Sequence, residues 1–166
     1  MIVHVVGNRP QFIKLAPLYF ALKSTGTEQM IIHSGQHYDP SLSQIFFDEL
    51  NIPKPAVNLG VGSGTHAEIT AKALVGLEKE LLQVKPELVI VYGDTDTTLA
   101  AALAASKLNI PLAHVEGGVR THSRTNPEEQ NRIVVDHLSS VIFCSDMIAV
   151  ENAKLEGLGN NSYYTG

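Results

Sequence analysis

The feature that most constrains the fold is a regular alternation of short apolar runs with longer segments of helical periodicity. The first run, residues 2–6, is rich in β-branched side chains and ends at Gly7, and Pro10 then opens a helical pattern that continues to Leu22. Short runs bounded by turn residues are typical of buried strands. Strands that alternate with helices form βαβ units, and these build a parallel sheet covered on both faces. The sequence therefore predicts a doubly wound α/β domain.

The same pattern predicts the position of each element along the chain. Strands are expected at residues 2–6, 30–33, 88–91, 112–115, 141–143 and 163–164. Helices are expected at residues 10–22, 42–50, 65–84, 95–108 and 147–156, with a further helix that ends at residues 134–138. The proline- and glycine-containing residues 53–64 are expected to form a flexible connection.

Size, charge and cysteine content limit the class of protein. The chain has 166 residues, 44% of them hydrophobic and 17% charged, so we expect one domain with a sizeable core. Lys and Arg number 12 against 17 Asp and Glu, and the resulting net charge of −5 argues against nucleic-acid or anionic-membrane partners. Cys144 is the single cysteine, which suits a reducing compartment. Residues 1–6 are too short for a leader or a membrane span, so we expect a cytoplasmic protein.

Ligands of doubly wound sheets bind outside the carboxyl ends of the strands, so the residues that follow each expected strand are the candidates for a site. These segments are polar or glycine-rich, although helix N-caps alone would account for about half of them. They are residues 7–9, 34–37, 93–95, 116–118 and 145–146.

The first of these segments joins a tight turn to two cations. Arg9 stands at the start of the expected helix, and Lys14 lies about one turn further along it. Backbone N–H groups at a helix start, together with a guanidinium and an ammonium group, would suit a phosphate. The alternative is a surface Arg that pairs with an acid and a solvated Lys. Neither a dinucleotide fingerprint nor a P-loop is present, which disfavours an ordinary dehydrogenase or a nucleoside triphosphatase.

Three acids could carry proton transfer. Thr95 or Asp96 can cap the helix after residues 88–91, which leaves Asp94 over as a candidate catalytic carboxylate; an acid at a helix start is the ordinary alternative. Glu116 ends a strand beside two glycines, with a salt bridge to Arg120 as its structural alternative. Glu128 follows Asn126 and Pro127, and its alternative is an ordinary first helical turn.

Other chemistries find less support in the residue spacing. The seven histidines show no Cys/His or His-x-x-x-His spacing, so we expect no metal site. No serine stands in a nucleophile elbow, which disfavours a serine hydrolase. A cationic turn and three separate acids fit proton transfer on an anionic, nucleotide-linked substrate.

Five ordered motifs resemble those of a known family, the non-hydrolysing UDP-N-acetylglucosamine 2-epimerases. The family's motifs begin with Gly-x-Arg-Pro and Gly-Gln-His, continue through Gly-Asp-Thr and His-Val-Glu, and end with Pro-Glu-Glu-x-Asn-Arg. Together they extend over nearly the whole chain. The matching residues here are 7–14, 35–37, 92–95, 114–121 and 127–132.

The resemblance implies the N-terminal half of a two-domain enzyme of the glycosyltransferase-B type, with a Rossmann-like sheet. It implies that residues 1–166 form one domain and that the C-terminal UDP-binding domain, with most uridine contacts and a catalytic histidine, is absent from this chain. It also implies interconversion of UDP-N-acetylglucosamine and UDP-N-acetylmannosamine for surface polysaccharide precursors, without a cofactor, by a homodimer. Arg9 and Lys14 would serve the substrate phosphates, and Asp94, Glu116 and Glu128 would be the catalytic carboxylates.

Several residues depart from the commoner family pattern. Gln11-Phe12 replaces Glu-Ala and resembles relatives that act on UDP-2,3-diacetamido-2,3-dideoxyglucuronic acid, which makes this 2-epimerase the alternative activity. Gln36 is a candidate residue of an effector site, although Tyr38 stands where many bacterial members have Arg. Gly117 and Asn126 also differ without removing a carboxylate. A non-catalytic sugar-nucleotide-binding module, such as a sensor or a glycosyltransferase half-domain, is the alternative from a different class.

Overall fold

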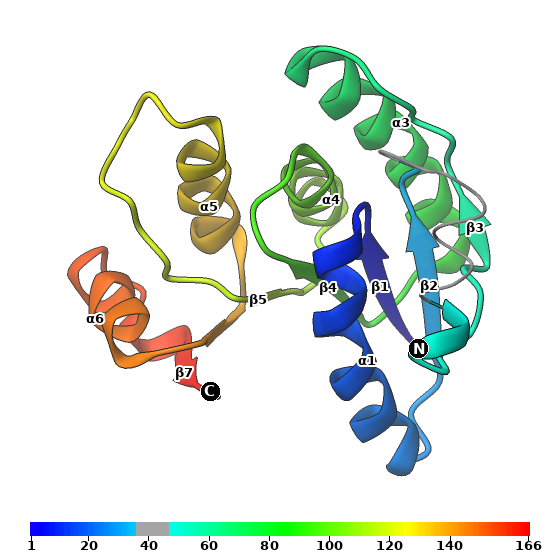
Figure 1. The fold of residues 1–166 in the computed structure, drawn as a ribbon, viewed down its shortest axis with the longest axis horizontal. Coiled ribbons are helices and arrows are strands. Elements are labelled where there is room, and N and C mark those ends of the chain that lie inside the picture. The colour runs from blue at the N-terminus through cyan, green and yellow to red at the C-terminus, as the bar shows by residue number, and fades with distance from the viewer. Residues whose placement is uncertain (36–46) are drawn as a thin grey trace.

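The computed structural model describes residues 1–35 and 47–166 and contains a seven-stranded, entirely parallel sheet (Figure 1). The strand order is β3-β2-β1-β4-β5-β6-β7, and each neighbouring pair runs parallel. The first six strands have the order of the Rossmann fold, so the predicted doubly wound class is confirmed. The strands are β1 (Ile2–Val6), β2 (Gln29–His33), β3 (Val57–Asn58), β4 (Leu88–Tyr92), β5 (Leu112–Val115), β6 (Val141–Cys144) and β7 (Ser162–Tyr164).

Capping residues define where the helices begin. Thr65 and Glu68 form a capping box at the start of α3, and Thr95 Oγ1 accepts a hydrogen bond from the N–H of Thr98 at the start of α4. Asn126 and Asp146 cap α5 and α6 in the same way. The helices are α1 (Arg9–Ser24), α3 (His66–Val84), α4 (Asp96–Lys107), α5 (Pro127–Leu138), α6 (Met147–Leu155) and a 3-10 turn, η1 (Gly159–Asn161).

The two faces of the sheet carry separate apolar cores. One core joins β1, β2, β4 and β5 to α3, α4 and α5, with Leu77, Leu81 and Ala101 fully buried. The other lies under α1, where Phe12 and Leu15 pack against the opposite face of the same strands. Figure 1 shows α1 on the opposite side of the sheet from α4 and α5. Successive side chains of a strand point to opposite faces, so both faces of the central strands are expected to be mostly apolar. They are, with buried histidines such as His4 of β1 and His114 of β5 as exceptions.

Most predicted elements are confirmed, with differences at short ones. The connection predicted over residues 53–64 contains a two-residue edge strand, β3, which pairs Val57 with Ile32. Two residues are too few to leave a periodic pattern in a sequence. The predicted helix at residues 42–50 falls mostly outside the described residues. Across the described ranges, no helix combines the length and apolar character needed to cross a membrane.

The strand order reverses direction between β1 and β4, and this switch point positions the site. The chain leaves β1 toward β2 on one side, whereas β4 leads to β5 on the other. The loops that follow β1 and β4 therefore separate at their carboxyl ends and leave a crevice. Asn8 follows β1 and Asp94 follows β4, so the fold places both residues at this crevice.

Candidate functional site

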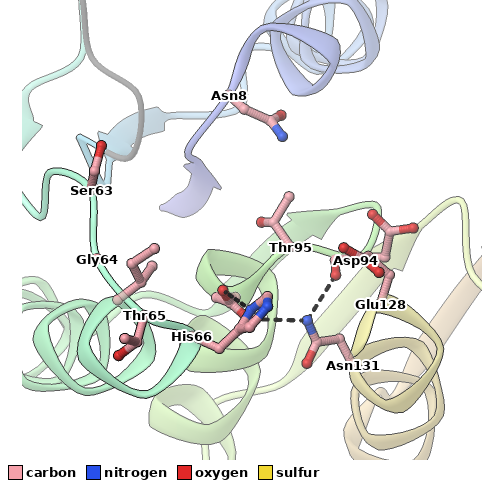
Figure 2. Close-up of a pocket in the computed structure, with 11 residues that line it drawn as sticks. Asn8, Ser63, Gly64, Thr65, His66, Asp94, Thr95, Glu128 and Asn131 are labelled. Atoms are coloured by element: carbon pink, nitrogen blue, oxygen red, sulfur yellow. Dashed lines mark hydrogen bonds and ion pairs between the residues drawn. The ribbon is translucent and has the colours of Figure 1, made fainter. Parts of the chain in front are cut away.

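A cavity of about 470 Å³ opens at the switch point. Asn8 and Asp94 line it from the loops after β1 and β4, His66 from the start of α3, and Glu128 and Asn131 from α5 (Figure 2). The structure thus brings together two of the three predicted carboxylates, Asp94 and Glu128, although they are 34 residues apart in the chain. Their shared cavity makes a pair of proton-transfer groups around one ligand physically reasonable.

Asp94 is oriented by a chain of charges that ends inside the protein. Arg132 donates from one guanidinium nitrogen to Asp94 Oδ2 at 2.5 Å and from the other to Glu129 Oε2 at 3.0 Å. Glu129 is 2% exposed and also accepts the backbone N–H groups of Thr121 and His122, at 2.9 and 2.8 Å. A guanidinium held by two carboxylates has little freedom to rotate, so Asp94 is fixed in direction.

Glu129, next to the predicted Glu128, therefore has a structural role. Burial alone would raise its pKa, but the N–H groups of Thr121 and His122 and the guanidinium of Arg132 outweigh burial and lower the pKa of Glu129 below its ordinary value. Glu128 lies on the first turn of α5, exposed, with its N–H donated to the Asn126 side chain at 3.0 Å. The two adjacent glutamates are thus divided between holding the loop and facing the cavity.

Glu116 and Lys14 form an ion pair and line a second cavity of about 230 Å³. A Cβ atom added at Gly93 would lie 3.6 Å from both Glu116 Oε2 and Lys14 Nζ, so the Gly93–Asp94 peptide adjoins this second cavity as well as the first. Burial lowers the pKa of Lys14 against the attraction of Asp94. Glu116 has a φ of 70°, an uncommon value outside glycine that is often found at functional sites.

The structural alternative considered for Glu116, a salt bridge to Arg120, is wrong. Arg120 instead donates to Asp136 at 2.7 Å and to Glu156 at 2.6 Å. Asp136 is fully buried and also accepts from His114 Nδ1 at 2.6 Å and from the N–H of Gly118 at 3.0 Å. Through Arg120 and the N–H of Gly118, this charge cluster fixes the loop after β5 to Asp136 of α5. It leaves the Glu116 side chain directed toward Lys14.

The other candidate residues predicted from the sequence are Lys14, Arg9 and Gln36, of which Lys14 and Arg9 do not line the cavity of Asp94 and Glu128. Lys14 is partly buried and paired, so it is not the solvated lysine of the alternative interpretation. Arg9 is the exposed first residue of α1 and lines neither cavity. Gln36, the candidate effector residue, lies outside the described residues. Within residues 1–35 and 47–166, no group of three or more His, Cys, Asp or Glu side chains is placed to hold a metal ion.

Gln11 and Phe12, which distinguish this chain from the commoner family pattern, are both buried. Gln11 Nε2 donates to the Tyr92 carbonyl at 2.7 Å and to Thr98 Oγ1 at 3.1 Å, and its Oε1 accepts the N–H of Gly7. Gln11 thus ties the turn after β1 to the end of β4. Phe12 is 1% exposed and packs in the core under α1. Neither side chain lines either of the two cavities described above.

Three residues of the site were not proposed individually from the sequence, although Asn8 lies in the candidate segment 7–9. Asn8 Oδ1 is buried without a hydrogen-bond partner among the described residues, and Asn8 lines the larger cavity. His66 and Asn131 line it too. Asn131 lies inside one of the five motifs that resemble the family, whereas His66 was hidden by its position at an ordinary helix start. Such residues become visible only when distant segments come together.

The fold and the site define a Rossmann-like domain with a carboxylate-lined crevice at its topological switch point. The sequence model of the UDP-N-acetylglucosamine 2-epimerases matches residues 21–165. The chain belongs to this family.

Named relatives and solved structures agree with this assignment. The chain is 49% identical over 160 residues to the UDP-N-acetylglucosamine 2-epimerase of Methanocaldococcus jannaschii, covering 96% of this chain and 44% of that protein. It is 46% identical over 157 residues to the UDP-2,3-diacetamido-2,3-dideoxy-D-glucuronate 2-epimerase of Pseudomonas aeruginosa, covering 94% of this chain and 44% of that protein.

The crystal structure of the M. jannaschii enzyme in complex with UDP-GlcNAc and UDP superposes with a TM-score of 0.96 at 48% identity, covering 99% of this chain and 46% of that one. The Neisseria meningitidis enzyme bound to UDP-GlcNAc superposes with a TM-score of 0.93 at 31% identity, covering 99% of this chain and 45% of that one. The chain therefore spans less than half the length of the relatives it matches.

Proposed function

We propose that this chain supplies one wall of the active site of an enzyme that interconverts UDP-N-acetylglucosamine and UDP-N-acetylmannosamine. The observation that carries the proposal is the shared cavity of Asp94 and Glu128, with the Lys14–Glu116 pair beside it, in a chain of this family. The M. jannaschii relative named for this activity is 49% identical over 96% of this chain. The substrate class is thus a UDP-linked N-acetylhexosamine.

The chemistry explains why several acids and cations are needed. The C2 proton of the sugar is not adjacent to a carbonyl, so it cannot be removed by simple enolisation. Instead, a base takes the C2 proton while the C1–O bond to UDP breaks, and that electron pair leaves with the UDP oxygen. A C1=C2 double bond forms between the two carbons. UDP then adds back to C1, and a proton delivered to the other face of C2 inverts that centre.

The proposed roles follow from where each group lies. Asp94, Glu116 and Glu128 serve as the proton-transfer groups, with Asp94 and Glu128 facing one cavity and Glu116 the next. Lys14 stabilises the negative charge that develops on the departing UDP. Lys14 is suited to this because it is partly buried, where a charge interacts more strongly with a phosphate than it does in bulk water. Arg9 lines neither cavity, and its assignment to the same role rests on the family motif at residues 7–14.

We propose further that residues 1–166 are one domain and that the active site is completed by a second half of comparable length. The relatives are more than twice as long as the part of them that this chain matches. We call this chain joined to its proposed second half the complete polypeptide, and we propose that it forms a homodimer. The 166-residue chain alone should bind UDP weakly and be nearly inactive, and detectable epimerisation by it would contradict this.

The elimination route is tested by isotope incorporation. The complete polypeptide is incubated with UDP-N-acetylglucosamine in D2O, and the products are analysed by NMR. Solvent deuterium should appear at C2 of the product, because the proton that returns comes from a group that exchanges with solvent. A product without deuterium at C2 would exclude the proposed proton transfer.

The same-class alternative is 2-epimerisation of UDP-2,3-diacetamido-2,3-dideoxyglucuronic acid, favoured by the 46% identity to the P. aeruginosa enzyme. Both UDP-sugars are assayed with the complete polypeptide by following the anomeric proton. The substrate with the higher kcat/KM identifies the activity.

Catalysis is separated from mere binding by two substitutions. Glu116→Gln and Glu128→Gln in the complete polypeptide should abolish turnover. A non-catalytic sugar-nucleotide sensor would keep its ligand response in both variants, and that result would contradict the enzyme assignment.

A further inference from the structure

His66 and Asp96 form a pair at the edge of the cavity of about 470 Å³, and the proposed proton-transfer scheme does not use this pair. His66 Nδ1 lies 2.8 Å from Asp96 Oδ2. The Asp96 carboxylate is 9% exposed, whereas the His66 side chain is 67% exposed and lines the cavity with Asp94 and Glu128. The acid is therefore held inside the protein, whereas most of the imidazole is exposed at the cavity.

Asn131 holds the other oxygen of Asp96. Its Nδ2 donates to the Asp94 carbonyl at 2.9 Å and to Asp96 Oδ1 at 3.4 Å. The Asp94 carbonyl and the ionised Asp96 carboxylate are hydrogen-bond acceptors and cannot donate. The Asn131 amide therefore has one allowed orientation, with its nitrogen toward them. Asn131 is 6% exposed. Asn131 thus holds the buried Asp96 carboxylate in a fixed orientation against the His66 ring.

This support selects the tautomer of His66. An ionised carboxylate accepts a hydrogen bond, so Nδ1 of a neutral His66 must carry the proton. Nε2 then holds a lone pair, and no described residue forms a hydrogen bond with it. His114 shows the contrast, because it is fully buried and both of its ring nitrogens are engaged, by Asp136 and by the Gly93 carbonyl. Of these two histidines, His66 is therefore the one with a ring nitrogen, Nε2, that can bind a ligand.

We propose that His66 is a sugar-contact residue whose Nε2 accepts a hydrogen bond from an O–H or N–H group of the substrate's hexosamine, with Asp96 and Asn131 as the positioning residues that set its tautomer. This rests on the proposed function for the identity of the substrate. The cavity favours such a neutral donor because its wall carries the carboxylates of Asp94, Asp96 and Glu128. Negative ligand groups are repelled by these acids, whereas hydroxyl and amide N–H groups are attracted.

A purely structural role explains the arrangement less well. An ion pair with a partner that is 67% exposed contributes little to stability, roughly 0–1 kcal/mol. Burying the Asp96 carboxylate costs free energy that such an exposed partner offsets only in part. A carboxylate that orients an outward-facing imidazole is the arrangement used elsewhere to fix one ring tautomer.

The first test needs only the 166-residue chain and no activity. Long-range 1H–15N NMR near pH 8.5 distinguishes a protonated ring nitrogen from a bare one. In the wild-type chain, His66 should show a protonated Nδ1 and a bare Nε2. In Asp96→Asn, Asn131 keeps donating to the oxygen of the introduced amide, so the nitrogen of that amide faces His66 and the tautomer should reverse. A protonated Nε2 in the wild-type chain would overturn the proposal even if epimerisation were demonstrated.

The second test asks whether the donor to His66 is a ring hydroxyl or the acetamido N–H of the sugar. The chain is titrated with UDP-N-acetylglucosamine and, separately, with UDP-glucose, which lacks the acetamido group. A ring hydroxyl as the donor predicts a shift of the His66 Nε2 resonance with both ligands. The amide N–H predicts a shift with UDP-N-acetylglucosamine alone. No shift with either ligand at concentrations that shift other cavity residues would contradict contact by His66.

The third test uses kinetics of the complete polypeptide. Losing one hydrogen bond of ordinary strength corresponds to a change of about 3- to 10-fold in KM. His66→Ala and Asp96→Asn should both raise KM by this factor with a smaller change in kcat, and His66→Gln, whose carbonyl can accept near the Nε2 position, should restore it. Lys79→Ala, an exposed change on the same helix, is the control. Unchanged KM in His66→Ala overturns the inference, whereas an inactive wild type overturns only the proposed function.

Discussion

The guanidinium of Arg132 lies 2.5 Å from Asp94 Oδ2, which links the loop after β4 to helix α5. The same guanidinium reaches the buried Glu129 at 3.0 Å. The direction of a proposed catalytic carboxylate is therefore set by a cation that is itself anchored in the protein. The bridge therefore ties the loop after β4 to α5, two segments that are 38 residues apart in the chain.

Arg132→Lys should damage catalysis more than folding. A lysine keeps the positive charge but has no planar fork, so it cannot bond Asp94 and Glu129 together in the observed geometry. We expect kcat of the complete polypeptide to fall about 10- to 100-fold with little change in KM, as misplaced catalytic groups do. The measurement is steady-state kinetics with UDP-N-acetylglucosamine. Unaltered kcat would show that the bridge does not orient Asp94.

Glu129→Gln should remove part of the acid sensitivity of the fold. The folded-state pKa of Glu129 is lowered, so its contribution is present above the ordinary carboxyl pKa of about 4.3 and is lost as the pH falls through the folded value. The variant should be less stable than wild type at pH 7, and the difference should shrink toward pH 3. Urea unfolding across this range measures it. A constant difference at all pH values would contradict the assignment.

His33→Asn should reduce the pH dependence of the unfolding free energy between about pH 4 and 6.5. His33 is 1% exposed, and burial lowers its pKa from 6.5 to about 4. The unfolded chain therefore takes up a proton before the folded one, and up to about 3 kcal/mol of stability is lost as the pH falls from about 6.5 to 4.

Asparagine can still accept the Gly35 N–H that His33 Nδ1 accepts at 2.7 Å, but it does not titrate. The slope of unfolding free energy against pH should be smaller in the variant over this interval. His4, also buried with a pKa of about 4, remains in both proteins and supplies the residual slope. Equal slopes in both proteins would refute the prediction.

Gly118→Ala should destabilise the loop that carries Glu116, and Gly26→Ala is its matched control. Both glycines have a φ of 76°. An added Cβ at Gly118 would clash with the Ala149 carbonyl oxygen, whereas nothing lies within 4 Å at Gly26. Gly26→Ala should cost about 1 kcal/mol from backbone strain alone, and Gly118→Ala at least about 2 kcal/mol more from the clash. Chemical denaturation of both variants tests this, and equal losses would argue that the loop adapts.

Local sequence was sufficient to predict most of the elements and to nominate the candidate carboxylates. The β-branched run at residues 2–6 and the helical pattern after Pro10 correspond to β1 and α1, because periodicity and turn residues act over short stretches of chain. Asp94 and Glu128 were identifiable because each follows a strand or opens a helix beside residues that already satisfy the cap.

The partners of these groups were decided only when the chain folded. Lys14 and Glu116 are 102 residues apart, and Arg120 turns to Asp136 and Glu156 rather than to nearby Glu116. No local pattern encodes such pairs, because they form only when the parallel sheet brings the carboxyl ends of β1, β4 and β5 to one edge. The amino-acid order alone was enough to predict a doubly wound domain with acids after its strands. The packing of α3 and α5 around that edge decided which acids share a cavity and placed His66 beside them.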